Sequence, residues 1–402
     1  MFAMRNTFLV NPISAEYGSW MLPYLLLFLT VLVFPQMAHS QNFDSGAPQA
    51  VLLDADTGTI LYAKEAETQI PPASLAKLMT MEVVFDRLKQ GTLKLTDEFF
   101  VSENAWRNGG ANSGGSTMFA KVNTSITLEN LIRGVIIQSA NDGCIVIAEG
   151  LAGTESTFAD LMNERARAIG LDNSRFTNST GLPDDNQYVT ISDLAKLAKH
   201  IINTYPEYYS YYSEPEFEWN NINQRNRNPL LSMNIDADGM KTGYTEASGY
   251  AIVGSSTRDG QRLITVLSGM TSTKERAEEA RKILDWGFRA FERLNLFDDK
   301  QVVGSVPVYG GAVSSVDVTG NGPIEIYLPV GSRDKLVARI AYNYPMMPAI
   351  EKGQEIAKLK IWIGDTLSQE TPLYAMSDVE KGDIKRRAMD AMKELLTAWI
   401  PN

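Results

Sequence analysis

The sequence predicts an α+β domain built on a mainly antiparallel sheet, followed by a small all-β domain. Two segments with alternating apolar residues, 250–257 and 261–268, are joined by Asp259-Gly260, a strong signal for an antiparallel hairpin. Segments with apolar residues at helical spacing stand on both sides of this hairpin. After residue 298, short alternating segments are separated by glycine and proline, which is typical of an all-β domain.

The predicted α+β domain begins with a hairpin and a buried helix. Residues 50–53 and 60–62 flank the turn Asp56-Thr57-Gly58. Pro71-Pro72 then end any strand. A helix is expected from about Ser74, because the apolar residues that follow it recur at helical spacing.

Helices and loops alternate in the middle of the chain. A stretch rich in glycine and asparagine, 94–124, predicts a long surface loop. Helical patterns follow at 128–151 and 192–202, with the turn-rich segment 176–189 between them. A long helix at 274–293, with one apolar stripe, completes the domain.

Composition divides the chain into four parts. Residues 1–40 have the features of a secretory signal peptide, because about fourteen mostly apolar residues, 21–34, precede a small-residue cleavage site. Residues 41–297 form the α+β domain and 298–378 the β-rich domain. An amphipathic helix is expected over 379–402.

Alternatives remain open for both ends. The first twenty residues carry only Arg5 against Glu16, so a start downstream of Met1 or an uncleaved anchor could replace the simple signal peptide. The final helix could pack on its own β domain or lie in a membrane interface. Five basic and four acidic side chains from residue 379 onward give weak attraction to anionic lipid. We favour the membrane surface because the helix is terminal and its apolar residues share one face: Ala388, Met389, Met392, Leu395, Leu396 and Trp399.

Composition also limits the partners. The net charge of −11 and the sequence pI near 4.9 argue against nucleic acid, which would require a basic face. The single cysteine, Cys144, cannot form an internal disulfide and lies in an apolar, helix-like run. We therefore expect a buried structural thiol.

Ser74-x-x-Lys77 is the first candidate for a catalytic pair. A serine hydroxyl needs an adjacent base to attack a carbonyl carbon. The chain has two histidines, of which His39 falls in the predicted signal peptide and His200 on a predicted helix, where a structural role is expected. A lysine one helical turn after the serine is a known alternative base.

Two further motifs follow in order: Ser139-Ala140-Asn141, in a loop before a helix, and Lys241-Thr242-Gly243, shortly before the strand near residue 250. The three motifs together resemble the penicillin-recognising serine acyltransferases. Flanking segments narrow the resemblance to the low-molecular-mass penicillin-binding proteins that act as D-alanyl-D-alanine carboxypeptidases, serine peptidase family S11. These segments are 72–80, 132–134, 138–142 and 238–245.

This resemblance extends over nearly the whole expected mature chain. It implies a penicillin-binding-protein/β-lactamase-like transpeptidase domain, a β-rich domain and a C-terminal amphipathic anchor. It also implies an exported, periplasmic protein attached peripherally to the outer face of the cytoplasmic membrane through that helix. The expected partners are a peptidoglycan stem peptide and, as covalent inhibitors, β-lactam antibiotics. No metal, no cofactor and no nucleic acid are expected.

The first two motifs are expected to perform the chemistry. Lys77 must be neutral to accept a proton from Ser74, and we expect burial and the positive charge of Lys241 to lower its pKa. Ser139 can relay a proton towards the leaving amine. Asn141 offers its amide to the substrate backbone.

The third motif is expected to bind substrate. Lys241 and Thr242 supply a positive charge and a hydroxyl for the terminal carboxylate, and the missing side chain of Gly243 lets an extended peptide pair with the strand edge. The resemblance implies an oxyanion hole made of the backbone N–H groups of Ser74 and Tyr244.

Two arginines and two departures from the family pattern complete the candidate site. Arg227 and Arg276 match family positions near the substrate carboxylate, although either could be a solvated surface residue. Tyr244 stands where histidine is often found, and Ala140 where glycine is common. Because the role of Tyr244 is a main-chain one, we expect altered substrate preference or deacylation rate, not another reaction.

The resulting prediction is an enzyme that removes the terminal D-Ala from stem pentapeptides through an acyl-enzyme on Ser74. A β-lactamase usually carries Glu-x-x-Asn after the middle motif. We expect no such sequence between Asn141 and Lys241, where Glu164 is followed at that spacing by Arg167. A non-catalytic β-lactam-sensing or wall-binding module would keep the motifs without turnover. A DD-endopeptidase is hard to separate by sequence, although the added β domain favours the carboxypeptidase.

Overall fold

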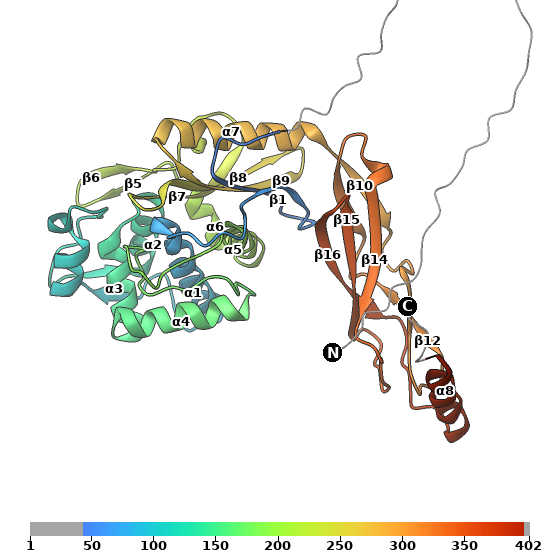
Figure 1. Ribbon diagram of the computed structural model, residues 1–402. Helices are drawn as coiled ribbons and strands as arrows, with labels where there is room; N and C mark the ends of the chain where they lie inside the picture. Colours follow the sequence, from blue (N-terminus) through green and yellow to red (C-terminus); the bar gives the residue numbers. More distant parts are fainter. Residues whose placement is uncertain (1–42, 398–402) are drawn as a thin grey trace, which may run out of the picture. The chain divides into compact units, whose positions relative to one another are not determined.

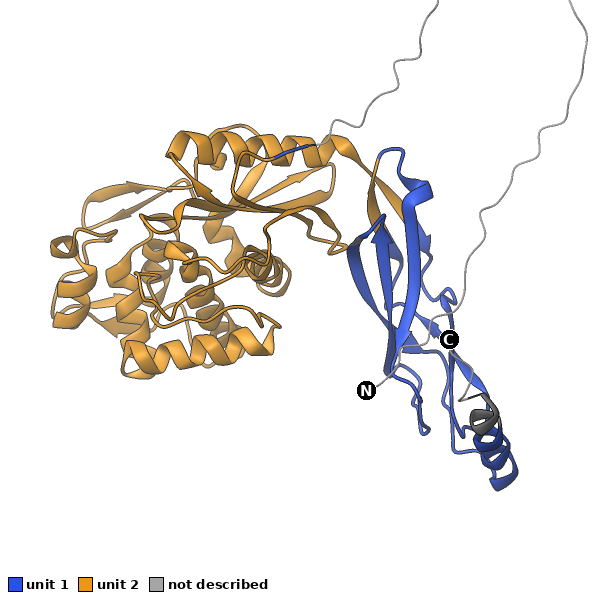
Figure 2. Cartoon of the chain, viewed as in Figure 1, with its two compact units in different colours: residues 1–44, 295–325, 330–402 blue, residues 45–294, 326–329 orange. Residues whose placement is uncertain are grey.

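The computed structural model describes residues 43–397, so the predicted signal peptide and Trp399 lie outside the described residues. The described chain divides into two compact units (Figure 2). One comprises residues 45–294 and 326–329. The other comprises residues 43–44, 295–325 and 330–397.

A five-stranded antiparallel sheet with the order β2-β1-β9-β8-β7 is the base of the larger unit (Figure 1). The predicted hairpins are both present, and β1 pairs with β9 so that Val51 lies opposite Val266. Strand β7 is at the edge of the sheet. The strands are β1 Gln49–Asp54, β2 Ile60–Lys64, β7 Ala237–Thr245, β8 Gly249–Arg258 and β9 Gln261–Met270.

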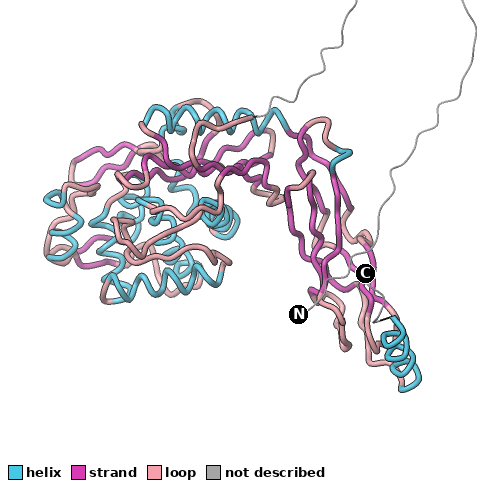
Figure 3. Tube along the Cα trace, in the orientation of Figure 1, coloured by secondary structure: helices cyan, strands magenta, loops and turns pink. Residues whose placement is uncertain are grey.

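Helices cover both faces of this sheet, as Figures 1 and 3 show. Helix α7, Thr273–Ala290, packs on one face, where Gly287 allows close approach because a Cβ there would lie 2.5 Å from Leu52 Cδ2. The neighbours of Leu52, Val51 and Leu53, point to the opposite face and join the main core with the other helices. These are α1 Lys77–Lys89, α2 Leu128–Ile137, α3 Asn141–Ala152, α4 Glu155–Ala168, α5 Ile191–Thr204 and α6 Pro206–Tyr209.

Helix α1 runs through the middle of this core. Ten of its thirteen residues are buried, including Lys77 at its start. A helix enclosed on all sides is fixed by packing in every direction, so the side chains at its beginning are held firmly.

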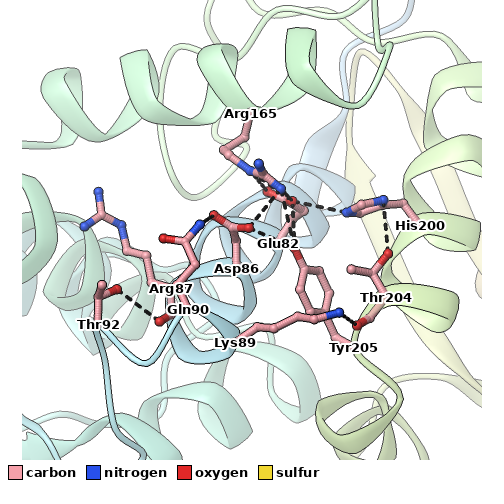
Figure 4. A network of polar contacts seen from close by, with 10 residues as sticks. All are labelled: Glu82, Asp86, Arg87, Lys89, Gln90, Thr92, Arg165, His200, Thr204 and Tyr205. Carbon is pink, nitrogen blue, oxygen red and sulfur yellow. Dashed lines mark hydrogen bonds and ion pairs between the residues drawn. The ribbon is translucent and has the colours of Figure 1, made fainter. Parts of the chain in front are cut away.

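A polar network further along α1 ties it to two other helices (Figure 4). The fully buried Glu82 accepts hydrogen bonds from Arg165 of α4 at 2.5 Å and from the Tyr205 hydroxyl at 3.1 Å. His200 of α5 lies 3.4 Å away through Nε2. Burial raises the pKa of Glu82, but its contacts with His200 and Arg165 outweigh burial and leave that pKa below its ordinary value. Removing one partner of the Glu82–Arg165 ion pair costs about 3–5 kcal/mol. His200 packs against this pair, which is the structural role expected of it.

Three predicted elements differ from those observed. The loop expected at 94–124 contains the short strand β3, Glu98–Phe100, which pairs with β4, Ser125–Thr127. The single helix expected at 128–151 is broken into α2 and α3. Lys241 lies inside β7, not ahead of the strand near residue 250, because the motif forms an edge strand of its own.

Two elements have no counterpart in the prediction. Helix α4 was missed because its apolar residues are few and widely spaced. The hairpin of β5, Glu216–Trp219, and β6, Ile222–Arg225, was missed because both strands are short.

The smaller unit contains a second five-stranded antiparallel sheet, with the order β11-β12-β16-β15-β14, and confirms the predicted all-β domain. Strand β10, Phe291–Phe297, pairs with β13, Ile324–Pro329, in a separate ribbon. The sheet strands are β11 Gly304–Pro307, β12 Ser315–Thr319, β14 Leu336–Tyr342, β15 Glu355–Ile363 and β16 Thr366–Ala375.

Three large apolar residues of helix α8, Ile384–Thr397, are exposed. Ile384, Met389 and Met392 are 82, 65 and 61% exposed, whereas Asp390 on another face accepts a hydrogen bond from the Gly310 N–H at 2.9 Å. The side chains of Leu395 and Leu396 lie outside the described residues. Within residues 43–397, no helix combines the length and the apolar character needed to cross a membrane.

Candidate active site

Ser74 lies in the short 3-10 turn Ala73–Ala76, directly before α1, and is half-buried. Ala73 has a φ of 48°, in the left-handed region that costs energy for a residue with a side chain. The turn is packed against Gly181, where a Cβ would collide with the Ala73 carbonyl oxygen. The backbone of Gly181 therefore forms one wall behind the turn that carries Ser74.

Lys77 is buried, with 1% of its surface exposed, and is surrounded by oxygen atoms. Its Nζ donates to Ser74 Oγ at 3.1 Å and to Asn141 Oδ1 at 2.8 Å. The Thr180 carbonyl oxygen accepts a third hydrogen bond from Lys77 at 2.5 Å. Burial lowers the pKa of Lys77 to about 8, so a substantial fraction of the amine is neutral near physiological pH.

These three partners determine where the lone pair of a neutral Lys77 points. A neutral amine has two N–H donors and one lone pair. The Asn141 Oδ1 and the Thr180 carbonyl can only accept, so they take the two N–H groups. Ser74 Oγ is the partner that carries a proton, and the lone pair is left facing it.

Ser139 lies in the break between α2 and α3 with a φ of 64°. The residue is 2% exposed, and within the described part of the chain its Oγ has no hydrogen-bond partner. Next along the chain, the Asn141 N–H donates to the Ser116 carbonyl at 2.8 Å. Asp142 accepts backbone hydrogen bonds from Met118 and Ala120, which fixes the segment that faces α3.

Thr180 and Ser116 are site residues that sequence reasoning missed. Thr180 contributes its carbonyl oxygen, which is set in place by Asn178 Oδ1 accepting from the N–H groups of Thr180 and Gly181. The run Asn178-Ser179-Thr180-Gly181 was recognised as turn-rich, but a main-chain acceptor leaves no residue-type signature.

Lys241 lies on β7, is 2% exposed, and donates to the Thr242 carbonyl at 3.1 Å. Burial lowers the pKa of Lys241, and the positive charges of Lys77 and Arg227 lower it further. We expected burial and the charge of Lys241 to lower the pKa of Lys77. Burial is the largest cause at Lys77, as expected, but the cation that adds to it is Arg227 and not Lys241.

Gly243 brings β7 against the turn that carries Ser74. A Cβ at Gly243 would lie 3.2 Å from both Ala73 Cβ and Leu75 Cγ, so a side chain there would push the two segments apart. We expected this glycine to make room for a peptide at the strand edge. β7 is an edge strand, and the missing side chain also allows close packing behind Ser74.

The two arginines differ in their surroundings. Arg227 is exposed, and its Nη1 donates to Ser116 Oγ at 2.5 Å. Arg276, in the second turn of α7, is 8% exposed, and its Nε has no hydrogen-bond partner among the described residues. Burial lowers the pKa of Arg276. The surface-residue alternative therefore does not apply to Arg276.

Cationic side chains gather around the site although the chain is acidic. Lys77, Arg227 and Arg276 all lie close enough to Lys241 for their charges to lower its pKa. The net charge of the chain is −11, so this cluster is a local exception. A cleft of one charge sign attracts the opposite charge, here an anion such as a carboxylate.

Neither Cys144 nor the Glu-x-x-Asn sequence of the β5–β6 hairpin is among the candidate catalytic residues. Cys144 is fully buried, which confirms the expected internal thiol, and burial raises its pKa to about 12, so the thiol stays neutral. The expectation that no Glu-x-x-Asn lies between Asn141 and Lys241 is wrong, because Glu218-Trp219-Asn220-Asn221 has this form. Its first two residues end strand β5, where Glu218 is exposed, and its last two form the turn of the β5–β6 hairpin.

The fold and this arrangement are those of the penicillin-recognising serine acyltransferases. A family model described as D-alanyl-D-alanine carboxypeptidase, peptidase S11, matches residues 35–272, and one described as the C-terminal domain of penicillin-binding protein 5 matches 291–381. The chain belongs to the D-alanyl-D-alanine carboxypeptidase family. The predicted family, fold class and function are thereby confirmed.

Individual relatives resemble the chain over most of its length. It is 35% identical over 381 residues to D-alanyl-D-alanine carboxypeptidase DacC of Escherichia coli K12, covering 94% of this chain and 95% of that protein. The DacA protein of Haemophilus influenzae is 36% identical over 375 residues, covering 91 and 95%. The crystal structure of penicillin-binding protein 5 from Haemophilus influenzae superposes with a TM-score of 0.72 at 36% identity, covering 84% of this chain and 99% of that one.

We predict that Gly181→Ala disrupts the site through the collision with Ala73. The expected result is a fall of about 10²-fold in the rate at which a penicillin acylates the protein, because small displacements of a nucleophile have effects of that size. Gly170→Ala is the matched control, since Gly170 has nearly the same φ, 76° against 78°, but has nothing within 4 Å of its would-be Cβ. Equal losses in both variants would show that backbone strain, not the contact with Ala73, is responsible.

Proposed function

We propose that this chain is a serine-type carboxypeptidase that removes the terminal D-Ala from peptidoglycan stem pentapeptides through an acyl-enzyme on Ser74. The observation that supports this most is the hydrogen bond between Lys77 Nζ and Ser74 Oγ, at 3.1 Å, inside a buried pocket of acceptors. It pairs a nucleophile with a base whose lowered pKa suits proton transfer near neutral pH.

Acylation begins when the neutral amine of Lys77 takes the proton of Ser74. Ser74 Oγ then attacks the carbonyl carbon of the penultimate D-Ala, and the C–N bond to the last D-Ala breaks as the tetrahedral intermediate collapses. The leaving nitrogen needs a proton, and the unpartnered hydroxyl of Ser139 would give its own while it takes from Lys77 the proton that came from Ser74, so Lys77 is neutral again. The product is an ester on Ser74 and a free D-Ala.

Deacylation requires water to attack that ester. The neutral Lys77 can accept a proton from the water as its oxygen attacks the ester, and can return that proton to Ser74 Oγ as the acyl C–O bond breaks. This frees the shortened peptide and regenerates Ser74. A β-lactam follows the acylation step by opening its ring, and its acyl group stays attached where water attacks slowly. This accounts for β-lactams as covalent inhibitors.

We assign the terminal carboxylate of the substrate to the cluster of cationic side chains around Lys241. Lys241, Thr242 and Arg276 would bind it, with Arg227 adding positive charge. The buried cations gain most from such an anion, because their own charge is poorly solvated. Asn141 would offer its Nδ2 to the peptide backbone, since its Oδ1 is already used by Lys77.

The peptide itself is expected to lie along β7. The outer edge of this strand can accept an extended chain beside Gly243 and Tyr244. The N–H groups of Ser74 and Tyr244 would form the oxyanion hole, and the loss of one such donor typically lowers the rate about 10²–10³-fold.

The remaining assignments concern export and attachment. We infer a signal peptide at 1–40, a catalytic domain at 41–297, a β-rich domain at 298–378 and a membrane-associated helix at 379–402. The protein would be periplasmic, on the outer face of the cytoplasmic membrane. The exposed apolar side chains of Ile384, Met389 and Met392 support attachment to a lipid surface over packing on the β domain.

The main test is incubation of the purified protein with a stem pentapeptide, followed by mass spectrometry. Loss of one D-Ala is expected, and Ser74→Ala should lower that rate to below about one-thousandth. Ser210→Ala, at an exposed position of the larger unit, is the matched control and should keep the wild-type rate. Stable penicillin labelling without any peptide product would instead favour the β-lactam-sensing alternative.

A second prediction follows from the buried base. The pKa of Lys77 is lowered from the usual lysine range to about 8, so its neutral fraction grows as the pH rises through that value. The acylation rate by a penicillin should therefore increase between about pH 6.5 and 9, with its midpoint near 8. Stopped-flow measurement across this range checks it, and a rate independent of pH would contradict lysine as the base.

The membrane assignment has its own test. Deletion of 381–402 should release the protein from membranes. A sharper variant is Met389→Gln with Met392→Gln, because it keeps the hydrogen bond between Asp390 and Gly310. Both should lose binding in a liposome flotation assay, whereas Leu367→Gln, on the exposed surface of β16, should not. Unchanged partition of the double variant would refute the attachment through α8.

A further inference from the structure

Tyr250 lies between two residues of the candidate site, Tyr244 and Arg276. It stands at the start of β8, directly opposite Tyr244 of β7, and the two rings are 4.3 Å apart between centroids. The guanidinium of Arg276 lies over the ring of Tyr250, with 5.8 Å from Cζ to the centroid. Tyr250 therefore contacts both the residue after the third motif and the buried arginine.

No other described side chain fixes the guanidinium of Arg276. Its Nε has no hydrogen-bond partner within residues 43–397, and no carboxylate there forms an ion pair with it. Burying the charge of an arginine without a partner anion costs free energy. The face of the Tyr250 ring offsets part of this cost by contacting the guanidinium. Such cation–π contacts contribute from about 0.5 kcal/mol to 2 kcal/mol or more, depending on burial.

The backbone beneath Arg276 is held by different residues. Ser272 caps α7 by accepting from the Glu275 N–H at 3.1 Å, and Glu275 in turn accepts from the Thr271 N–H at 2.8 Å. These contacts join the first turn of α7 to the end of β9. They set the position of the Arg276 backbone but leave its long side chain free to choose a rotamer, and Tyr250 supplies the surface against which that rotamer rests.

We propose that Tyr250 is a positioning residue of the carboxypeptidase reaction: its ring, supported by Tyr244, aims the guanidinium of Arg276 at the terminal carboxylate of the substrate. This inference rests on the proposed role of Arg276. Tyr250 acts through Arg276, without touching the reacting atoms. Tyr244, a residue that is 51% exposed, gains a side-chain function in addition to its main-chain one.

The test is a double-mutant cycle between Tyr250 and Arg276. The rate constant kcat/KM for D-Ala release, and the second-order rate of acylation by a penicillin, are measured for Tyr250→Leu and Tyr250→Phe, each with Arg276 or Arg276→Ala. With Arg276 present, Tyr250→Leu should lower kcat/KM about tenfold, mainly through KM, and Tyr250→Phe should stay within about twofold. In the Arg276→Ala background, Tyr250→Leu should add less than about twofold.

A matched control comes from the opposite ends of the same two elements. Arg258 of β8 lies over the ring of Phe288 of α7, 4.6 Å from its centroid. Phe288→Leu removes this contact and should leave kcat/KM within about twofold. Thermal unfolding checks each variant, and Tyr250→Met replaces Tyr250→Leu if the latter does not fold.

Two results would overturn the proposal. One is an equal loss from Tyr250→Leu in both Arg276 backgrounds, and the other is a loss in Tyr250→Phe as large as in Tyr250→Leu. Failure of the proposed function gives a different signature, because the wild-type protein itself would then release no D-Ala.

Discussion

The burial of one amine, Lys77 Nζ, is the constraint on which the site depends. Three segments that are distant in the sequence meet at this atom: the turn of Ser74, the first residue of α3 and the loop of Thr180. An ammonium group in such a place is costly, and this cost is what lowers the pKa of the lysine. The same burial thus lowers the pKa of the amine, as the proposed role of a base requires, and calls for the acceptors that orient it.

The rest of the larger unit holds these segments in place. Helix α1 is enclosed by other helices, and the network around Glu82 fixes its later turns. At the front of the helix, Gly181 and Gly243 let two backbone segments close on the turn of Ser74. The nucleophile is therefore held by main-chain packing as much as by side chains.

Much of this could be predicted because the chemistry selects residue types at fixed spacing. Ser74 and Lys77 are one turn apart because the segment that carries them is helical, and the hairpin of β8 and β9 is encoded locally by Asp259-Gly260. The break at Ser139 was foreseen in part, as a loop before a helix. Its left-handed backbone was not, because a serine gives no sign of that conformation.

What could not be predicted depends on contacts between distant segments. The Thr180 carbonyl has no side-chain signature, and the burial of Arg276 results from the packing of α7 onto the sheet. The order of the causes that lower the pKa of Lys77 also depends on distances, which the sequence does not contain. The hydrogen bond that joins α8 to its own unit, from the Gly310 N–H to Asp390, also links distant parts of the chain and could not be predicted.

The unpaired charge of Arg276 has a thermodynamic consequence. Without a ligand, the folded protein keeps a guanidinium in a poorly solvated place, with no counter-ion of its own among the described residues. An anion that binds beside Arg276 offsets the unfavourable free energy of this poorly solvated charge, and it does so only in the folded state. By linkage, the ligand's carboxylate then acts as a missing part of the native structure, and its binding raises the resistance of the whole unit to unfolding.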